Sequence, residues 1–121
     1  MIKTNDLTLQ LLQELATSKY QFHLTGSRFF RTNHPRSDWD FLVEYQPGLS
    51  LWLISRGFAI GREYSDCSVS QVYGIYGIHI QEIKPIFLQK KLRIQEFLRS
   101  NDITPTEEVW NALLSNEVEI K

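Results

Sequence analysis

Two groups of side chains between residues 26 and 41 have the types and spacing needed for chemistry. Asp38 and Asp40 are separated by one residue at the start of a predicted strand, so both carboxylates point to the same face and can share divalent cations. Gly26 and Ser27 directly follow a shorter predicted strand, where a tight turn can present backbone N–H groups and a hydroxyl to phosphate oxygens. Together these groups can hold a triphosphate and Mg²⁺, which is what phosphoryl or nucleotidyl transfer requires.

The order of these features is more specific than either group alone. A strand, Gly-Ser, ten residues and then Asp-hydrophobic-Asp-hydrophobic within a second strand resembles the signature of the nucleotidyltransferase superfamily, the fold shared by DNA polymerase β-like enzymes. The chain looks most like the minimal members, which include small phage-encoded nucleotidyltransferase-like proteins and the antitoxin partners of HEPN toxins. The resemblance covers about residues 20–45, and the rest agrees in element order. It implies one minimal nucleotidyltransferase domain over residues 1–121.

The resemblance also implies an activity and roles for individual residues. The protein would move a nucleoside monophosphate from an NTP such as ATP to a hydroxyl of a protein, an RNA end or a small molecule. Gly26 and Ser27 would bind the phosphates, while Asp38 and Asp40 would bind Mg²⁺ or Mn²⁺ and serve catalysis. One metal ion would accompany the triphosphate, and the other would lower the pKa of the attacking hydroxyl. Arg28 follows Ser27 and either pairs with a phosphate oxygen or is solvated.

The third acid that is usual in the superfamily has no clear counterpart here. It commonly lies within a hydrophobic-Asp-hydrophobic stretch on a later strand, and the matching stretch is residues 78–83. His79 falls at the expected position, and Glu82, the nearby acid, points to the opposite face if the strand is regular. Three alternatives follow: Glu82 supplies the carboxylate at a β-bulge, His79 replaces it, or the site has only two acids. Without a third acid, the chain would be a catalytically degraded binding module, acting as an antitoxin or a host-interaction protein.

Lys91 lies within the apolar stripe of a long helix predicted from Pro85 to about Arg99. A lysine there must either extend its ammonium group to solvent or find an anion. Because this helix follows the predicted strand at residues 78–83, it could aim Lys91 at a triphosphate. We therefore include Lys91 among the candidate phosphate-binding residues.

The elements that must position these residues are predicted from periodicity and from Gly and Pro. Their order is helix, strand, short helix, strand, helix, strand, strand, helix, helix, which predicts an α+β fold with a mixed sheet flanked by helices. The helices are expected at 6–18, 51–57, 85–99 and from about 104, the strands at 20–24, 39–45, 68–76 and 78–83, and a short polar connection at 28–36.

Composition bounds the class of protein. The chain has 121 residues and a net charge of −1, which suits one globular domain and argues against coating of DNA or membranes by bulk charge. The single cysteine, Cys67, excludes an internal disulfide or a zinc cluster. The sequence lacks a long apolar run and a signal-peptide pattern, so we expect a soluble cytoplasmic protein. Because so short a chain leaves the site shallow, we expect a partner protein or a homodimer.

Overall fold

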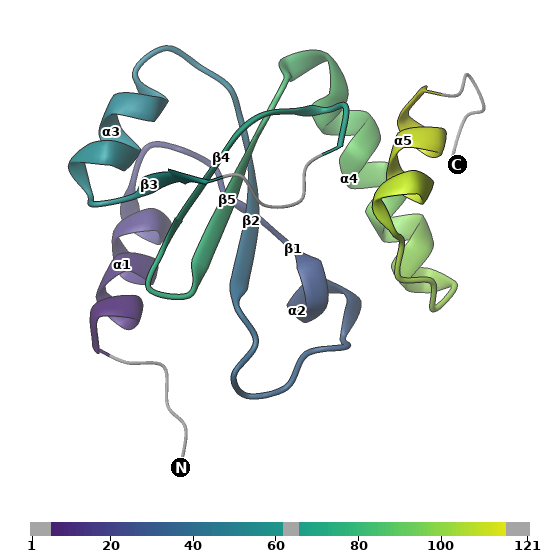
Figure 1. Cartoon of the computed structure of the whole chain (residues 1–121), viewed down its shortest axis with the longest axis horizontal. Coiled ribbons are helices and arrows are strands. Elements are labelled where there is room, and N and C mark those ends of the chain that lie inside the picture. Colours follow the sequence, from purple (N-terminus) through teal and green to yellow (C-terminus); the bar gives the residue numbers. More distant parts are fainter. Residues whose placement is uncertain (1–5, 62–65, 116–121) are drawn as a thin grey trace.

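In the part of the chain that the structure describes, a five-stranded mixed sheet forms the centre of the fold, and five helices surround it (Figure 1). The structure is a computed structural model, and it describes residues 6–61 and 66–115. It is a small single-domain α+β protein. The helices are α1 Asp6–Thr17, α2 Gly26–Phe30, α3 Leu49–Ser55, α4 Pro85–Ser100 and α5 Glu107–Ser115. The strands are β1 His23–Thr25, β2 Trp39–Glu44, β3 Ala59–Gly61, β4 Val69–Ile75 and β5 Ile78–Ile83.

The order of strands in the sheet is β1-β2-β5-β4-β3. The β2 and β5 strands are parallel neighbours, whereas the other pairs are antiparallel. Asp40 in the second strand lies opposite Thr25 on one side and His79 on the other. The sheet therefore brings residues from three distant parts of the sequence to the same place.

Each face of the sheet is covered by its own helices (Figure 1). On one face, α1 and α3 pack on a core that contains Val43, Tyr73 and Ile80. On the other face, α4 covers Leu42 and Ile83, and α5 packs on α4. Because side chains alternate along a strand, the residues that share a face with Leu42 point toward α4. Asp40, His79 and Gln81 belong to this second face.

Most of the predicted elements are present with small shifts at their ends. The turn at Tyr76 and Gly77 has φ angles of 49° and 76°, as expected for a tight hairpin between β4 and β5. The short helix predicted between the first two strands begins directly at Gly26, earlier than the polar connection suggested. The β3 strand was not predicted, because it has three residues and its Ala59 and Ile60 side chains are exposed, so it shows no alternating pattern.

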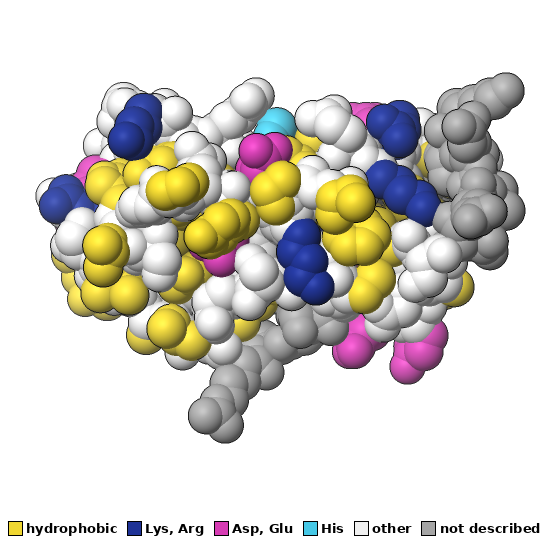
Figure 2. Space-filling view, turned by 90° about the horizontal axis from the view of Figure 1, so that it is seen from above, with side chains coloured by type: hydrophobic (Ala, Val, Ile, Leu, Met, Phe, Trp, Pro, Cys, Tyr) yellow, Lys and Arg dark blue, Asp and Glu magenta, His cyan; other side chains and the backbone are white. Residues whose placement is uncertain are grey.

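The surface mixes apolar and charged side chains. On the face seen in Figure 2, hydrophobic side chains lie between basic and acidic ones, and neither sign of charge covers the face. Among the described large hydrophobic residues, Leu51 and Ile86 are the most exposed, at 75% and 85%. Within residues 6–61 and 66–115, no helix has the length and apolar character needed to cross a lipid bilayer.

Candidate functional site

A pocket of about 280 Å³ opens on the α4 side of the sheet. Its walls come from the β1–α2 junction, from neighbouring positions of β2, β5 and β4, from α4, and from α5 with the segment that leads into it. The residues that line it include Thr25, Gly26, Ser27, Asp40, Val72, His79, Gln81, Lys91, Thr104 and Trp110. The pocket thus contains four of the predicted site residues, Gly26, Ser27, Asp40 and Lys91, together with His79.

Gly26 stands against the Asp40 carboxylate. Its φ angle is +71°, in the left-handed region that glycine adopts without strain. A Cβ atom at this position would overlap the Asp40 side chain and come within 2.8 Å of its Cγ. Glycine is therefore required here for two reasons: it adopts this backbone conformation without strain, and it leaves room for the Asp40 carboxylate.

The Asp40 carboxylate lies in an unfavourable environment for a negative charge. Burial raises its pKa above the ordinary value, the nearby His79 lowers it, Asp38 raises it and Arg28 lowers it, in decreasing order of effect. Among the described residues, Asp40 forms no ion pair with a lysine or an arginine. A half-buried carboxylate that has no cationic partner in contact is suited to bind a cation.

Asp38 and His79 form a pair at the rim of the pocket. The Asp38 Oδ2 and His79 Nε2 atoms are 3.2 Å apart, and both side chains are partly exposed. The backbone N–H of Trp39 donates to the Gly77 carbonyl, which ties the start of β2 to the hairpin beside His79. The structure therefore places His79, the residue at the expected third position, next to both aspartates.

Arg28 supports the loop before β2 and does not line the pocket. Its Nη2 donates to the Ser37 carbonyl at 2.8 Å, and its Nε donates to the Asp38 carbonyl at 3.3 Å. Its guanidinium group also lies 3.9 Å from the centre of the Trp39 ring. These contacts hold the backbone that presents Asp38, a role that differs from both alternatives drawn from the sequence, a phosphate contact and a solvated side chain.

Glu82 lies on the other face of the sheet, away from the aspartates. The β2–β5 register is continuous from Trp39 and Ile78 to Glu44 and Ile83, so no bulge turns Glu82 toward the pocket. Its side chain is buried, and its Oε1 accepts a hydrogen bond from the Ser70 hydroxyl at 2.8 Å. Of the three alternatives for the third position, the structure does not realise the one in which Glu82 joins Asp38 and Asp40.

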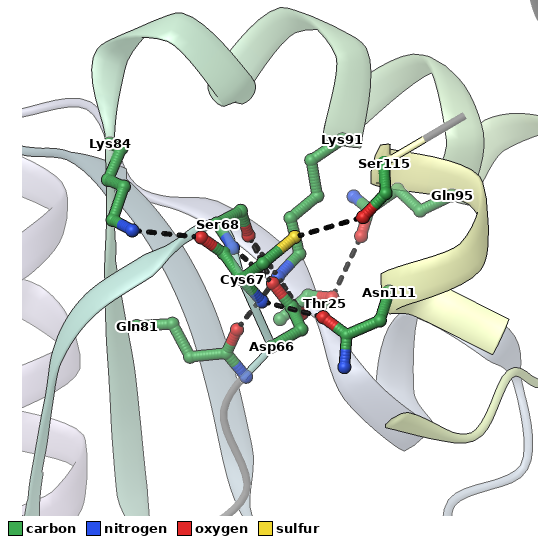
Figure 3. A network of polar contacts seen from close by, with 10 residues as sticks. All are labelled: Thr25, Asp66, Cys67, Ser68, Gln81, Lys84, Lys91, Gln95, Asn111 and Ser115. Atoms are coloured by element: carbon green, nitrogen blue, oxygen red, sulfur yellow. Dashed lines mark hydrogen bonds and ion pairs between the residues drawn. The ribbon is translucent and has the colours of Figure 1, made fainter. Parts of the chain in front are cut away.

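Lys91 is 1% exposed and forms the core of a polar network on the pocket wall (Figure 3). Its Nζ donates to Asp66 Oδ2 at 2.6 Å, to Ser68 Oγ at 3.0 Å and to Gln81 Oε1 at 3.2 Å. Burial lowers the pKa of Lys91, and the adjacent Asp66 carboxylate opposes this effect. An ammonium group has three N–H donors, and these contacts use all three. Lys91 is therefore neutralised by Asp66, and it cannot bind a triphosphate as expected without giving up one of these partners.

The network also attaches α5 to the rest of the protein. The Asn111 side chain accepts a hydrogen bond from the Cys67 backbone at 2.8 Å (Figure 3). In addition, the Lys91 Nζ lies 5.0 Å from the centre of the Trp110 ring. Trp110 is buried and forms part of the pocket wall. The α5 helix is thus held in place by residues that flank or belong to the pocket.

Sequence reasoning did not find Asp66, Gln81 or Trp110 as parts of the site. A lysine within an apolar stripe does require an anion, but the sequence does not specify which acid supplies it. Thr25 was also missed, although its hydroxyl is buried and donates to Gln95 Oε1 at 2.8 Å. These residues are brought together by tertiary packing, which leaves no local pattern.

Within the described ranges, Asp38 and Asp40 are the carboxylates placed to contact a metal ion at this site. Among the residues that the structure describes, no group of three or more His, Cys, Asp and Glu side chains is arranged to hold one. Comparison of the chain with family models, with characterised proteins and with solved structures finds no match.

Proposed function

We propose that this protein has a nucleotidyltransferase fold, that it binds an NTP together with a divalent cation in the pocket, and that it transfers the nucleoside monophosphate to a hydroxyl acceptor. The observation that carries the proposal is the position of Asp40. Its half-buried carboxylate has no lysine or arginine partner among the described residues, and it touches the glycine of the Gly26–Ser27 turn. A cation bound to Asp40 would therefore lie beside the group that is best suited to phosphate.

The residues present fit a cation that arrives with its nucleotide. Mg²⁺ is usually bound through one or two carboxylates, with phosphate oxygens of the substrate and water completing its coordination. Asp38 and Asp40 supply two carboxylates, which matches this way of binding Mg²⁺. The described residues therefore need not form a complete metal site in the absence of the nucleotide. Carboxylate ligands suit Mg²⁺ and Mn²⁺ alike.

The roles of the chain's own groups follow from their positions. Asp38 and Asp40 would hold the cation, and the pair between Asp38 and His79 fixes the orientation of the more exposed carboxylate. Ser27 and the backbone of Gly26 would bind the phosphates, and Arg28 would keep the Ser37–Asp38 backbone in place. The cation, when bound, neutralises phosphate charge and activates the attacking hydroxyl. The acceptor is a protein, an RNA end or a small molecule.

Calorimetry with each of the four NTPs in the presence of Mg²⁺ or Mn²⁺ tests the binding step. We expect the Asp38→Asn/Asp40→Asn variant to bind the nucleotide at least about 10- to 100-fold more weakly, a loss already typical for residues that only support metal ligands. Asp102→Asn is the matched control, because Asp102 is exposed and has a φ of 56°, which asparagine tolerates. Unchanged binding by the double Asn variant would refute the proposal.

The transfer step has its own test, because the position of Glu82 favours a second candidate function. With Glu82 turned to the other face, the site holds two acids and His79, and the fold could serve to bind a nucleotide or a protein partner without transfer. Incubation with labelled NTP, Mg²⁺ or Mn²⁺, and candidate proteins or tRNA separates the two functions. Label transferred by the wild type and not by the double Asn variant supports the transferase. Tight nucleotide binding with no transfer to any acceptor supports the binding module.

A further inference from the structure

Gln81 is a pocket residue whose amide is oriented by its neighbours. It lies two residues after His79 on β5, so both side chains point toward α4. Its Oε1 accepts a hydrogen bond from Lys91 Nζ, while its Nε2 forms no hydrogen bond with any described residue. A turn of the amide by 180° would exchange the positions of its oxygen and its NH₂ group.

The buried network settles which end of the amide faces Lys91. Asp66 can only accept hydrogen bonds when ionised, so the Ser68 hydroxyl donates its hydrogen to Asp66 Oδ1. The Ser68 oxygen then accepts from Lys91, which also donates to Asp66. The third N–H of the ammonium group points at Gln81, and an ammonium group cannot accept a hydrogen bond. The amide oxygen must therefore face Lys91, and the NH₂ group must face the other way.

We infer that the Gln81 NH₂ group donates a hydrogen bond to an acceptor atom of the nucleoside, so that Gln81 is a binding residue and the Asp66–Lys91 ion pair positions it. This inference rests on the proposed function. The other residues of the site would bind the phosphates and the cation, and Gln81 would add a contact to the nucleoside.

The place of Gln81 in the pocket favours the nucleoside over the phosphates. Two residues along a strand correspond to about 7 Å, so Gln81 lies that far from His79 and the cation-binding end of the pocket. Around it the walls include Val72 and Trp110, which are suited to a sugar or a base and poorly suited to phosphate. The positive charge nearest to it, that of Lys91, is neutralised by Asp66 at 2.6 Å.

The test compares nucleotides with inorganic tripolyphosphate, each with Mg²⁺, by calorimetry. Gln81→Met keeps the length of the side chain but removes the donor, and we expect it to weaken NTP binding about 3- to 10-fold, the usual effect of one hydrogen bond. Gln81→Glu keeps the shape and turns the donor into an acceptor, and we expect a loss of at least about 10-fold. Binding of tripolyphosphate should not change with Gln81→Met. Gln89→Glu on the exposed side of α4 is the matched control for the added charge.

The outcomes separate this inference from the proposed function. If the wild type binds an NTP, if Asp38→Asn/Asp40→Asn loses that binding and if Gln81→Met binds as the wild type does, the inference is wrong and the proposed function stands. If Gln81→Met weakens tripolyphosphate and NTP equally, Gln81 contacts phosphate and the inference is also wrong. If the wild type binds no NTP, the proposed function and the inference fall together. Thermal unfolding of each variant identifies any that fail to fold. Gln81→Asn, which withdraws the amide by one methylene, then replaces such a variant, and we expect it to weaken NTP binding by the same factor.

Discussion

Replacement of Gly26 by alanine perturbs the site through two separable costs. An L-residue held in the left-handed region costs about 1–2 kcal/mol. In addition, the new methyl group would meet the Asp40 side chain, whose Cγ and Cβ would lie 2.8 and 2.9 Å away. Overpacking of this kind typically costs about 1–3 kcal/mol. We therefore expect Gly26→Ala to lower the free energy of unfolding by about 2–5 kcal/mol, within the total stability of an ordinary domain.

The chain contains a control that isolates the second cost. Gly48 has a φ of +89°, and a methyl group there would meet only the Tyr20 Oη at 3.7 Å, an ordinary contact. Gly48→Ala should therefore lose only the conformational cost of about 1–2 kcal/mol. Urea unfolding followed by circular dichroism gives both values, and the difference between them measures the overlap with Asp40.

A double-mutant cycle then attributes that difference to Asp40. Asp40→Gly removes all three atoms that the new methyl group would meet, so Gly26→Ala in that background should cost no more than Gly48→Ala. A coupling of about 1–3 kcal/mol is expected between positions 26 and 40. Equal losses for Gly26→Ala and Gly48→Ala in the wild-type background, or additive effects of the two changes, would refute the contact between the glycine and the carboxylate.

Two further predictions concern stability alone. Lys91→Met leaves the Asp66 carboxylate buried without its partner and should lower the free energy of unfolding by about 3–5 kcal/mol, as measured in urea. Adding Asp66→Leu should restore most of this loss. A loss below about 1 kcal/mol for the single change would contradict the buried pair. Burial lowers the pKa of His23 below its ordinary value of 6.5, so the unfolded chain binds the proton more tightly than the folded protein does. The stability that neutral His23 provides above pH 6.5 should therefore be lost as the pH falls through the lowered pKa. His23→Gln should flatten this part of the pH profile, and an unchanged profile would exclude His23 as its source.

The parts of the site that could be predicted from the sequence depend on local rules. Alternation along a strand placed Asp40 on the face opposite Phe41, and the same rule placed Glu82 opposite His79. The glycine after the first predicted strand indicated a tight turn, and the structure places Gly26 there with a φ of 71° and against Asp40. In each case the prediction depends only on a residue's neighbours in the chain or on the period of one element.

The remaining parts depend on which distant segments meet. Lys91 required an anion, but the choice of Asp66 follows from how α4 lies over the start of β4 and cannot be read from spacing. The role of Arg28 was likewise undetermined, because its contacts are with the Ser37 and Asp38 carbonyls of a loop whose path is set by the sheet. The β3 strand lies at the edge of the sheet, where pairing with β4 alone decides its conformation.

The parallel pairing of β2 with β5 has a consequence for how the protein folds. The hairpin of β4 and β5 joins neighbours in the sequence, but Asp40 and His79 meet only when the long segment between them has closed. Contacts between distant residues form slowly, because the entropy of loop closure is lost before they contribute stability. The pocket should therefore be among the last parts of the protein to assemble during refolding. A nucleotide that binds there would stabilise the completed sheet and no earlier species, so its effect should be seen in the unfolding rate and not in the folding rate.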